Sequence, residues 1–145
     1  MDQLFAAHGG KKLHHANLIY GGAGEDPLGI ALRLSAILLC KTNTACGTCR
    51  SCKRVEKLEH PDLNFTFPFV SGGNTGTADD FLKEFRSALL KKPLLEPGSW
   101  QRQITSKNQQ LKIPVKEIQN LPQKLSLTAA EGGNKVLIIW MPEQI

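Results

Sequence analysis

The spacing of apolar residues predicts that the chain begins with a strand, a glycine loop and a helix. Residues 17–20 (NLIY) form a short apolar run that ends at glycines, which is typical of a buried strand. Residues 21–24 (GGAG) predict a loop. Asp26 and Pro27 favour a helix start, because aspartate caps a first turn and proline fits its first position. Helical spacing continues to about Leu39, and this order of elements typically opens an α/β nucleotide-type domain.

The middle of the chain shows strand-like alternation followed by helical spacing. Residues 63–70 (LNFTFPFV) alternate as a strand does, and Pro68 predicts that this strand ends there or lies at a sheet edge. The apolar residues expected on one face are Leu63, Phe65, Phe67 and Phe69. Residues 79–91 then predict a helix, and Ser99 is placed to cap a shorter helix that runs to Ile104.

The last third of the chain predicts a helix followed by a buried strand. The helix begins at Pro114 and runs to Leu125, with Pro122 expected to bend or break it. Its expected inward positions are Val115, Ile118, Leu121 and Leu125. Residues 135–141 (KVLIIWM) are almost continuously apolar, as buried parallel strands are. A central strand rarely ends a domain, so we expect the domain to be truncated on its C-terminal side, beyond Ile145.

Length and composition favour one folded intracellular domain. The chain has 145 residues, of which 41% are hydrophobic and 21% are charged, so it can form a packed core. Its net charge of +5 permits a polyanion or an acidic partner without requiring one. Residues 1–12 predict a short helix over 3–8 and a turn, not a secretory signal, and residues 71–77 predict a flexible linker. No apolar run is long enough to cross a bilayer, so we expect a cytoplasmic protein with reduced thiols.

Four cysteines within thirteen residues carry the most specific chemistry in the sequence. Their spacing is C-x5-C-x2-C-x2-C, and the predicted ligands are Cys40, Cys46, Cys49 and Cys52. Four thiolates suit a tetrahedral Zn²⁺ ion, and a site filled by four protein ligands is structural, not catalytic. Basic neighbours can offset the formal charge of the thiolate site; these are Lys41, Arg50, Lys53 and Arg54. A redox Cys-x-x-Cys pair is the alternative interpretation. A polar helix over 50–59 should follow and stop at residues 60–62 (HPD).

The glycine loop has the position of a phosphate loop but lacks its chemistry. A working loop reads G-x-x-x-x-G-K-[ST], whereas the window from Gly21 reads GGAGEDPL. The degenerate site would comprise Gly21, Gly24, Asp26, Pro27 and Leu28. The predicted strand over 135–139 likewise ends at Trp140, where a nucleotide site would have acidic residues. We therefore expect no bound ATP, and an unrelated glycine turn remains the alternative.

Several segments resemble one family of proteins. Residues 13–24, the cysteine segment 46–52 (CGTCRSC) and residues 60–62 resemble the N-terminal AAA+ domain of bacterial clamp-loader subunits. Residues 115–139, which end in EGGNKVLII, match the segment that leads to the family's second nucleotide motif. The zinc block after the first helix is the specific element of this resemblance, because the strand pattern alone occurs in many families.

The resemblance implies a three-layer α/β fold of the P-loop/AAA+ type, with a parallel sheet and helices on both faces. It covers about residues 13–70 and 113–145. Residues 1–145 would form the N-terminal part of that domain, with a zinc module at 40–52 and an unmatched insertion at 71–112. The family's fold places a further strand between the two apolar strands at 17–20 and 135–141. We therefore expect an open sheet edge that can pair with another copy of the chain.

The resemblance also implies a function without catalysis. Motor subunits of the family keep a lysine–threonine pair and an acidic strand end, whereas this chain has Pro27, Leu28 and Trp140. It is therefore similar to the family's non-hydrolysing subunit, a rigid part of the replicative polymerase complex that helps load the sliding clamp onto primed DNA. Implied partners are the gamma/tau motor subunits, the delta subunit and, through the complex, the clamp and DNA. The arginine that such a subunit gives to a neighbour's ATP site would lie beyond residue 145.

Two other functions remain open at this point. The chain could be an active AAA+ ATPase motor subunit, which Pro27 and Leu28 disfavour. It could also be a separate zinc module that binds nucleic acid, which would need aromatic residues interleaved with basic ones. Tyr20 and both tryptophans lie outside the basic cysteine segment, which disfavours this alternative.

Overall fold

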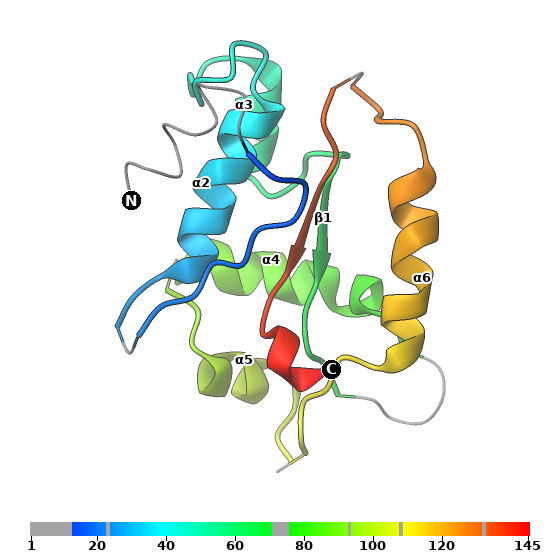
Figure 1. Cartoon of the computed structure of the whole chain (residues 1–145). Helices are drawn as coiled ribbons and strands as arrows, with labels where there is room; N and C mark the ends of the chain where they lie inside the picture. The colour runs from blue at the N-terminus through cyan, green and yellow to red at the C-terminus, as the bar shows by residue number, and fades with distance from the viewer. Residues whose placement is uncertain (1–12, 23, 71–75, 93, 108, 132) are drawn as a thin grey trace.

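A computed structural model describes residues 13–22, 24–70, 76–92, 94–107, 109–131 and 133–145 (Figure 1). These residues form a mixed α/β fold around a small parallel sheet, so the predicted α/β class is confirmed. The helix expected over 3–8 and most of the linker expected over 71–77 lie outside the described residues. No helix in the described part of the chain is long and apolar enough to span a membrane.

The sheet consists of two parallel strands, β1 (Leu63–Thr66) and β2 (Val136–Ile139), which lie side by side at the centre of Figure 1. The register pairs Leu63 with Val136 and Thr66 with Ile139. Backbone N–H groups extend the pairing at both ends, from Val136 to the Asp62 carbonyl and from Trp140 to the Thr66 carbonyl, each at 2.8 Å. β1 is shorter than the strand predicted over 63–70. Its end before Pro68 agrees with the prediction that the strand stops at this proline, which has no N–H to donate.

The strand predicted at residues 17–20 is wrong. These residues have no strand partner, and Leu18 and Tyr20 are 79% and 86% exposed. An isolated strand leaves its backbone N–H and C=O groups without partners, so a four-residue apolar run becomes a strand only beside a neighbour. Among the described residues β2 pairs with β1 alone, which leaves its other edge unpaired. The three-layer sheet and the association of copies through this edge therefore stay predictions.

The first helix is the predicted one, and the second is shorter than expected. α2 (Pro27–Leu39) has Asp26 as its N-cap and proline at its start. α3 (Arg50–Glu56) packs against α2, and the polar helix had been expected to reach residue 59. In Figure 1 the strands lie between α2 on one side and α6 (Val115–Ser126) on the other. The cysteine segment is thereby held at one end of the α2–α3 pair.

Residues 76–107 contribute much of the core. They form η1 (Ala78–Phe81), α4 (Leu82–Lys91) and α5 (Pro97–Ile104). Phe85 of α4 stacks on Phe67 with ring centroids 4.0 Å apart, and the Trp100 ring lies edge-on to both at 5.4 Å. The indole N–H of Trp100 donates to the Pro68 carbonyl at 2.7 Å. The predicted apolar face of the strand segment is confirmed, since all of Leu63, Phe65, Phe67 and Phe69 are buried.

The helix starts and faces differ from prediction in two places. α5 begins at Pro97 with Glu96 as its N-cap, so Ser99 is not the cap. α6 continues through Pro122 without a break. Its inner face is rotated from the predicted one: Val115 is 64% exposed and Leu125 is also exposed.

A buried carboxylate explains the rotation of α6. Glu117 is fully buried and accepts hydrogen bonds from the Ala78 N–H at 3.2 Å and the Thr66 hydroxyl at 3.4 Å. The ammonium group of Lys124 lies 3.5 Å from Glu117 and 2.7 Å from Asp79. A buried carboxylate needs such donors, so these contacts turn Glu117 inward beside Leu121, which is buried as predicted, while Val115 and Leu125 face outward. Glu117 thus ties η1 to α6 and β1.

Candidate metal centre and glycine loop

The four cysteines come together in space as the spacing predicts. Their sulfur atoms all lie within 4.8 Å of one another, with 3.7 Å between Cys40 and Cys46 and 4.0 Å between Cys46 and Cys52. A tetrahedral Zn²⁺ ion with Zn–S bonds of about 2.3 Å holds its sulfurs about 3.8 Å apart. The donor set and its spacing therefore fit a structural zinc ion bound by Cys40, Cys46, Cys49 and Cys52.

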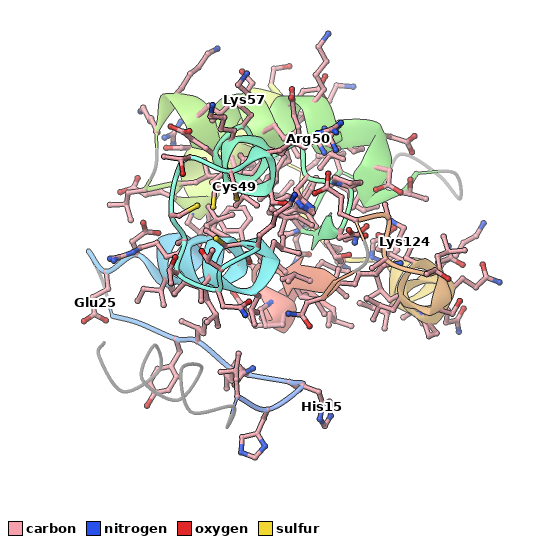
Figure 2. The ribbon with its side chains drawn as sticks, turned by 90° about the horizontal axis from the view of Figure 1, so that it is seen from above. His15, Glu25, Cys49, Arg50, Lys57 and Lys124 are labelled. Atoms are coloured by element: carbon pink, nitrogen blue, oxygen red, sulfur yellow. The ribbon has the colours of Figure 1, made fainter. Side chains whose placement is uncertain are left out.

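The two helices hold the cysteines at their ends. Cys40 is the C-cap of α2, and Cys49 is the N-cap of α3, where its sulfur accepts the Cys52 N–H at 3.4 Å. The loop between them turns sharply, with left-handed backbone at Asn43 and Ala45, which are not glycines, and at Gly47. Figure 2 shows the sulfur atoms gathered beside Cys49, over the end of α2. The segment has no strand and little apolar burial, so a bound ion is its natural source of stability.

Hydrogen bonds prepare part of the cluster to bind a cation. Burial raises the pKa of Cys40, but the Thr42 hydroxyl at 3.3 Å and backbone N–H groups outweigh it, so that its pKa is lowered to about 4. The Thr48 hydroxyl is the main cause that lowers the pKa of Cys46 to about 7. Burial raises the pKa of Cys52 to about 12. The cluster therefore mixes thiolates with a thiol that loses its proton when a metal ion binds.

A second polar network joins the metal segment to the loop before β2. Glu131 accepts hydrogen bonds from the Ser51 hydroxyl and the Arg54 guanidinium, both at 2.8 Å, and lies 3.3 Å from the buried Nε2 of His60. The Asp62 carboxylate accepts the N–H groups of Ala130 at 2.7 Å and Glu131 at 3.0 Å. In the sequence Glu131 stands out only as the first residue of the segment EGGNKVLII. A glutamate next to two glycines carries no local signal for a contact made across 80 positions.

We expect the Glu131 network to weaken in acid. The Ser51 hydroxyl, followed by His60 and Arg54, lowers the pKa of Glu131 against the opposing effect of desolvation. A carboxyl whose folded pKa is lowered stabilises the fold above its unfolded pKa, and this is lost as pH falls through the folded value. Glu131→Gln should cost about 1 kcal/mol at neutral pH after solvent screening, and less in acid. The measurement is the melting temperature of parent and variant from pH 7 to 4, with the metal content checked at each pH. If the melting temperature of the variant depended on pH as that of the parent does, the role given to the Glu131 carboxylate would be contradicted.

Two carboxylates accept backbone N–H groups, one in the glycine loop and one in the first turn of α2. Asp26 accepts the Gly29 N–H at 2.8 Å, and Glu25 accepts the Gly22 N–H at 2.5 Å. A Cβ atom at Gly29 would lie 2.0 Å from the Asp26 carboxylate, so the cap requires glycine there. Leu28, at the position of the hydroxyl in a working loop, is buried. The acceptors of both N–H groups are therefore carboxylates of the chain itself.

The end of β2 carries a side chain that packs against the core, at the place where a nucleotide site would have acidic residues. Trp140 follows the strand, and its ring centroid lies 5.6 Å from that of Phe85. Met141 adopts a left-handed turn, and Glu143 lies in the short helix η2 (Pro142–Gln144). The predicted strand over 135–141 is shorter than expected, and only Ile138 in it is buried, because one side of β2 has no described neighbour.

Comparison with known proteins identifies a family and one relative. A family model described as "DNA polymerase III, delta subunit" matches residues 1–145. A curated relative, DNA polymerase III subunit delta' of Bacillus subtilis (strain 168), is 41% identical over 59 residues. That alignment covers 39% of this chain and 18% of the relative, so it spans less than a fifth of the relative's length.

Proposed function

This chain belongs to the DNA polymerase III, delta subunit family, and we propose that it acts as a non-hydrolysing structural subunit of the clamp loader. Its likeness to a subunit delta' supports a delta-prime-like clamp-loader subunit in DNA replication. The proposal that the subunit does not hydrolyse ATP rests on the carboxylates that bind backbone N–H groups at the glycine loop. Asp26 and Glu25 take the N–H groups that an ATP-binding loop would offer to phosphates.

Electrostatics supports a loop that excludes nucleotide. A triphosphate at the start of α2 would meet the carboxylates of Glu25 and Asp26, and each like-charge contact at about 4 Å costs roughly 1–4 kcal/mol. Pro27 supplies no N–H, and buried Leu28 supplies no hydroxyl for Mg²⁺. No residue in the window from Gly21 to Leu28 brings a positive charge to offset these losses. The alternative of a motor subunit therefore lacks the groups that such a reaction requires.

The role of the chain would then be to support its neighbours. The four cysteines would hold Zn²⁺, which supplies fixed geometry and no chemistry. Proposed partners are the gamma/tau and delta subunits, with the sliding clamp and primed DNA reached through the complex in the cytoplasm. A subunit of this kind serves by holding one shape while the motor subunits change theirs.

Calorimetric titration with ATP and Mg²⁺ tests the proposal. We expect no heat of binding at millimolar nucleotide, whereas a gamma/tau subunit in the same buffer serves as the positive control. A clamp loader assembled with the full-length protein should load clamps onto primed DNA, and one assembled without it should not. Saturable micromolar binding of ATP, or equal loading in both assemblies, would contradict the proposed function.

A further inference from the structure

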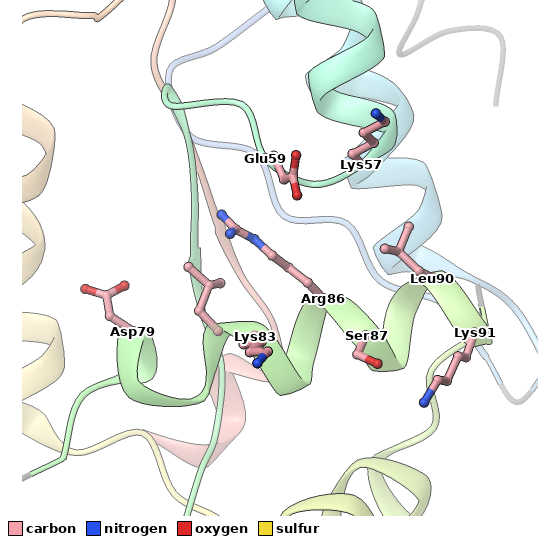
Figure 3. Close-up of a pocket in the computed structure, with 9 residues that line it drawn as sticks. Lys57, Glu59, Asp79, Lys83, Arg86, Ser87, Leu90 and Lys91 are labelled. Atoms are coloured by element: carbon pink, nitrogen blue, oxygen red, sulfur yellow. The ribbon is translucent and has the colours of Figure 1, made fainter.

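A shallow groove runs along one side of α4, away from the metal centre and the glycine loop. It has a volume of about 620 Å³ and lies between α4 and the segment that follows α3 (Figure 3). Its α4 wall follows helical spacing and is formed by Leu82, Lys83, Arg86, Ser87, Leu90 and Lys91. Lys57 and Glu59 line the groove from the other segment, and Asp79 lines it next to α4.

The groove carries an excess of positive charge. Lys57, Lys83, Arg86 and Lys91 line it, and none of the four forms an ion pair with a residue that the structure describes. Of the two acidic residues, Asp79 is already paired with Lys124 at 2.7 Å. Glu59 is left as the single unpaired acid against four cations.

Arg86 lies at the centre of this charge. Its side chain extends from α4 across the groove toward the segment of Glu59 (Figure 3). Its Nε atom is buried and has no hydrogen-bond acceptor among the described residues. Arg86 also has no ion-pair partner among the described residues, and a guanidinium in this position can bind a carboxylate that enters the groove.

Apolar side chains lie on either side of Arg86. Leu82 and Leu90 lie one helical turn before and after it, and Leu90 is 58% exposed. The opposite face of α4 is already buried through Phe85, Ala88 and Leu89. The groove face is therefore a second face of the helix with leucines between cations, on which Leu82 packs partly against the core and Leu90 is exposed.

We propose that this groove docks an acidic peptide segment of a partner protein, with apolar side chains that cover Leu82 and Leu90. Charge complementarity carries the choice of partner, because carboxylates fit the four cations and aliphatic groups fit the leucines. Nucleic acid fits less well, because no aromatic side chain lines the groove for base stacking. This inference does not depend on the absence of ATP hydrolysis.

A defined peptide tests the proposal on the full chain. The probe is a fluorescein-labelled peptide of about twelve residues, with leucine at every fourth position between glutamates, and binding is followed by anisotropy. Lys83→Glu combined with Lys91→Glu should weaken binding about tenfold or more, since both lysines are exposed in the groove. The matched control combines Lys107→Glu with Lys116→Glu, which changes the net charge equally at exposed sites outside the groove. It should stay within about twofold of the parent chain.

The following results would overturn the proposal. Absence of saturable binding to the parent chain would reject the groove as a peptide site. Equal weakening by both double variants would reduce the effect to net charge. A peptide with serine in place of leucine should bind about tenfold more weakly, and equal binding would reject the apolar contact.

A single-stranded oligonucleotide that binds through Lys83 and Lys91 while the peptide does not would make this a nucleic-acid site. Circular dichroism of all variants should match the parent.

Discussion

Cys52→Ser should abolish stoichiometric zinc binding and unfold the segment between α2 and α3. Cys52 is buried, its sulfur lies 4.0 Å from that of Cys46, and its N–H donates to Cys49. A serine hydroxyl is a poor zinc ligand, so three thiolates would remain around an open position. Structural zinc contributes roughly 10–16 kcal/mol in small zinc domains, a large share of which depends on the complete ligand set.

The strained loop between α2 and α3 should make the loss of stability in Cys52→Ser larger than the loss of one buried contact. Asn43 and Ala45 keep left-handed backbone conformations, which cost of order 1–3 kcal/mol each without a force that fixes them. Without the metal, α3 would lose its N-terminal anchor at Cys49. Ser51 and Arg54 lie on α3 and bind Glu131, so the loop before β2 would loosen as well.

Metal content and thermal unfolding measure the effect. The parent chain should contain one zinc ion per chain and the variant almost none, with a fall in melting temperature of roughly 10 °C or more for a loss of several kcal/mol. Glu56→Ala is the matched control, because Glu56 is exposed on α3 and holds no metal. Full zinc content in Cys52→Ser, or an equal loss in Glu56→Ala, would reject the assignment of the cluster.

Sequence patterns predicted features whose cause is local. The cysteine cluster followed from spacing alone, because two-residue gaps bring thiols around one point whatever surrounds them. The start of α2 followed from Asp26 and Pro27, which act within one helical turn. The apolar face of residues 63–69 followed from alternation. Each of these signals is complete within about a dozen residues.

Features that depend on distant partners could not be predicted from the sequence. The apolar run at residues 17–20 has the composition of a strand but lacks a described neighbour to pair with. Glu117 faces inward because Thr66 and Ala78, far from it in sequence, supply donors. Glu131 joins the site through Ser51, eighty positions away. A buried acid is unexpected from hydrophobic patterns, since its burial depends on donors that only the fold brings close.

Trp100→Ala should cause the other large loss of stability, although Trp100 lies in the segment expected to be an insertion. Its side chain is completely buried against the stacked rings of Phe67 and Phe85, and its indole N–H donates to the Pro68 carbonyl at 2.7 Å. Truncation of a buried tryptophan to alanine typically costs about 3–5 kcal/mol through the cavity that it leaves. Typical domains have only about 5–15 kcal/mol of stability, so the variant should be close to unfolding at 37 °C.

Trp100→Phe separates packing from hydrogen bonding. Phenylalanine keeps an aromatic ring against Phe67 and Phe85 but leaves the Pro68 carbonyl without its donor, which should cost about 1–3 kcal/mol. Urea unfolding of the zinc-loaded chain measures both variants, and the zinc content should stay at one, since Trp100 does not contact the cysteines. If residues 76–107 were an insertion that folds apart from the sheet, Trp100→Ala would leave the unfolding of the remaining chain unchanged. Because Phe67, directly after β1, packs on α4 and α5 together, we expect one cooperative transition that shifts as a whole.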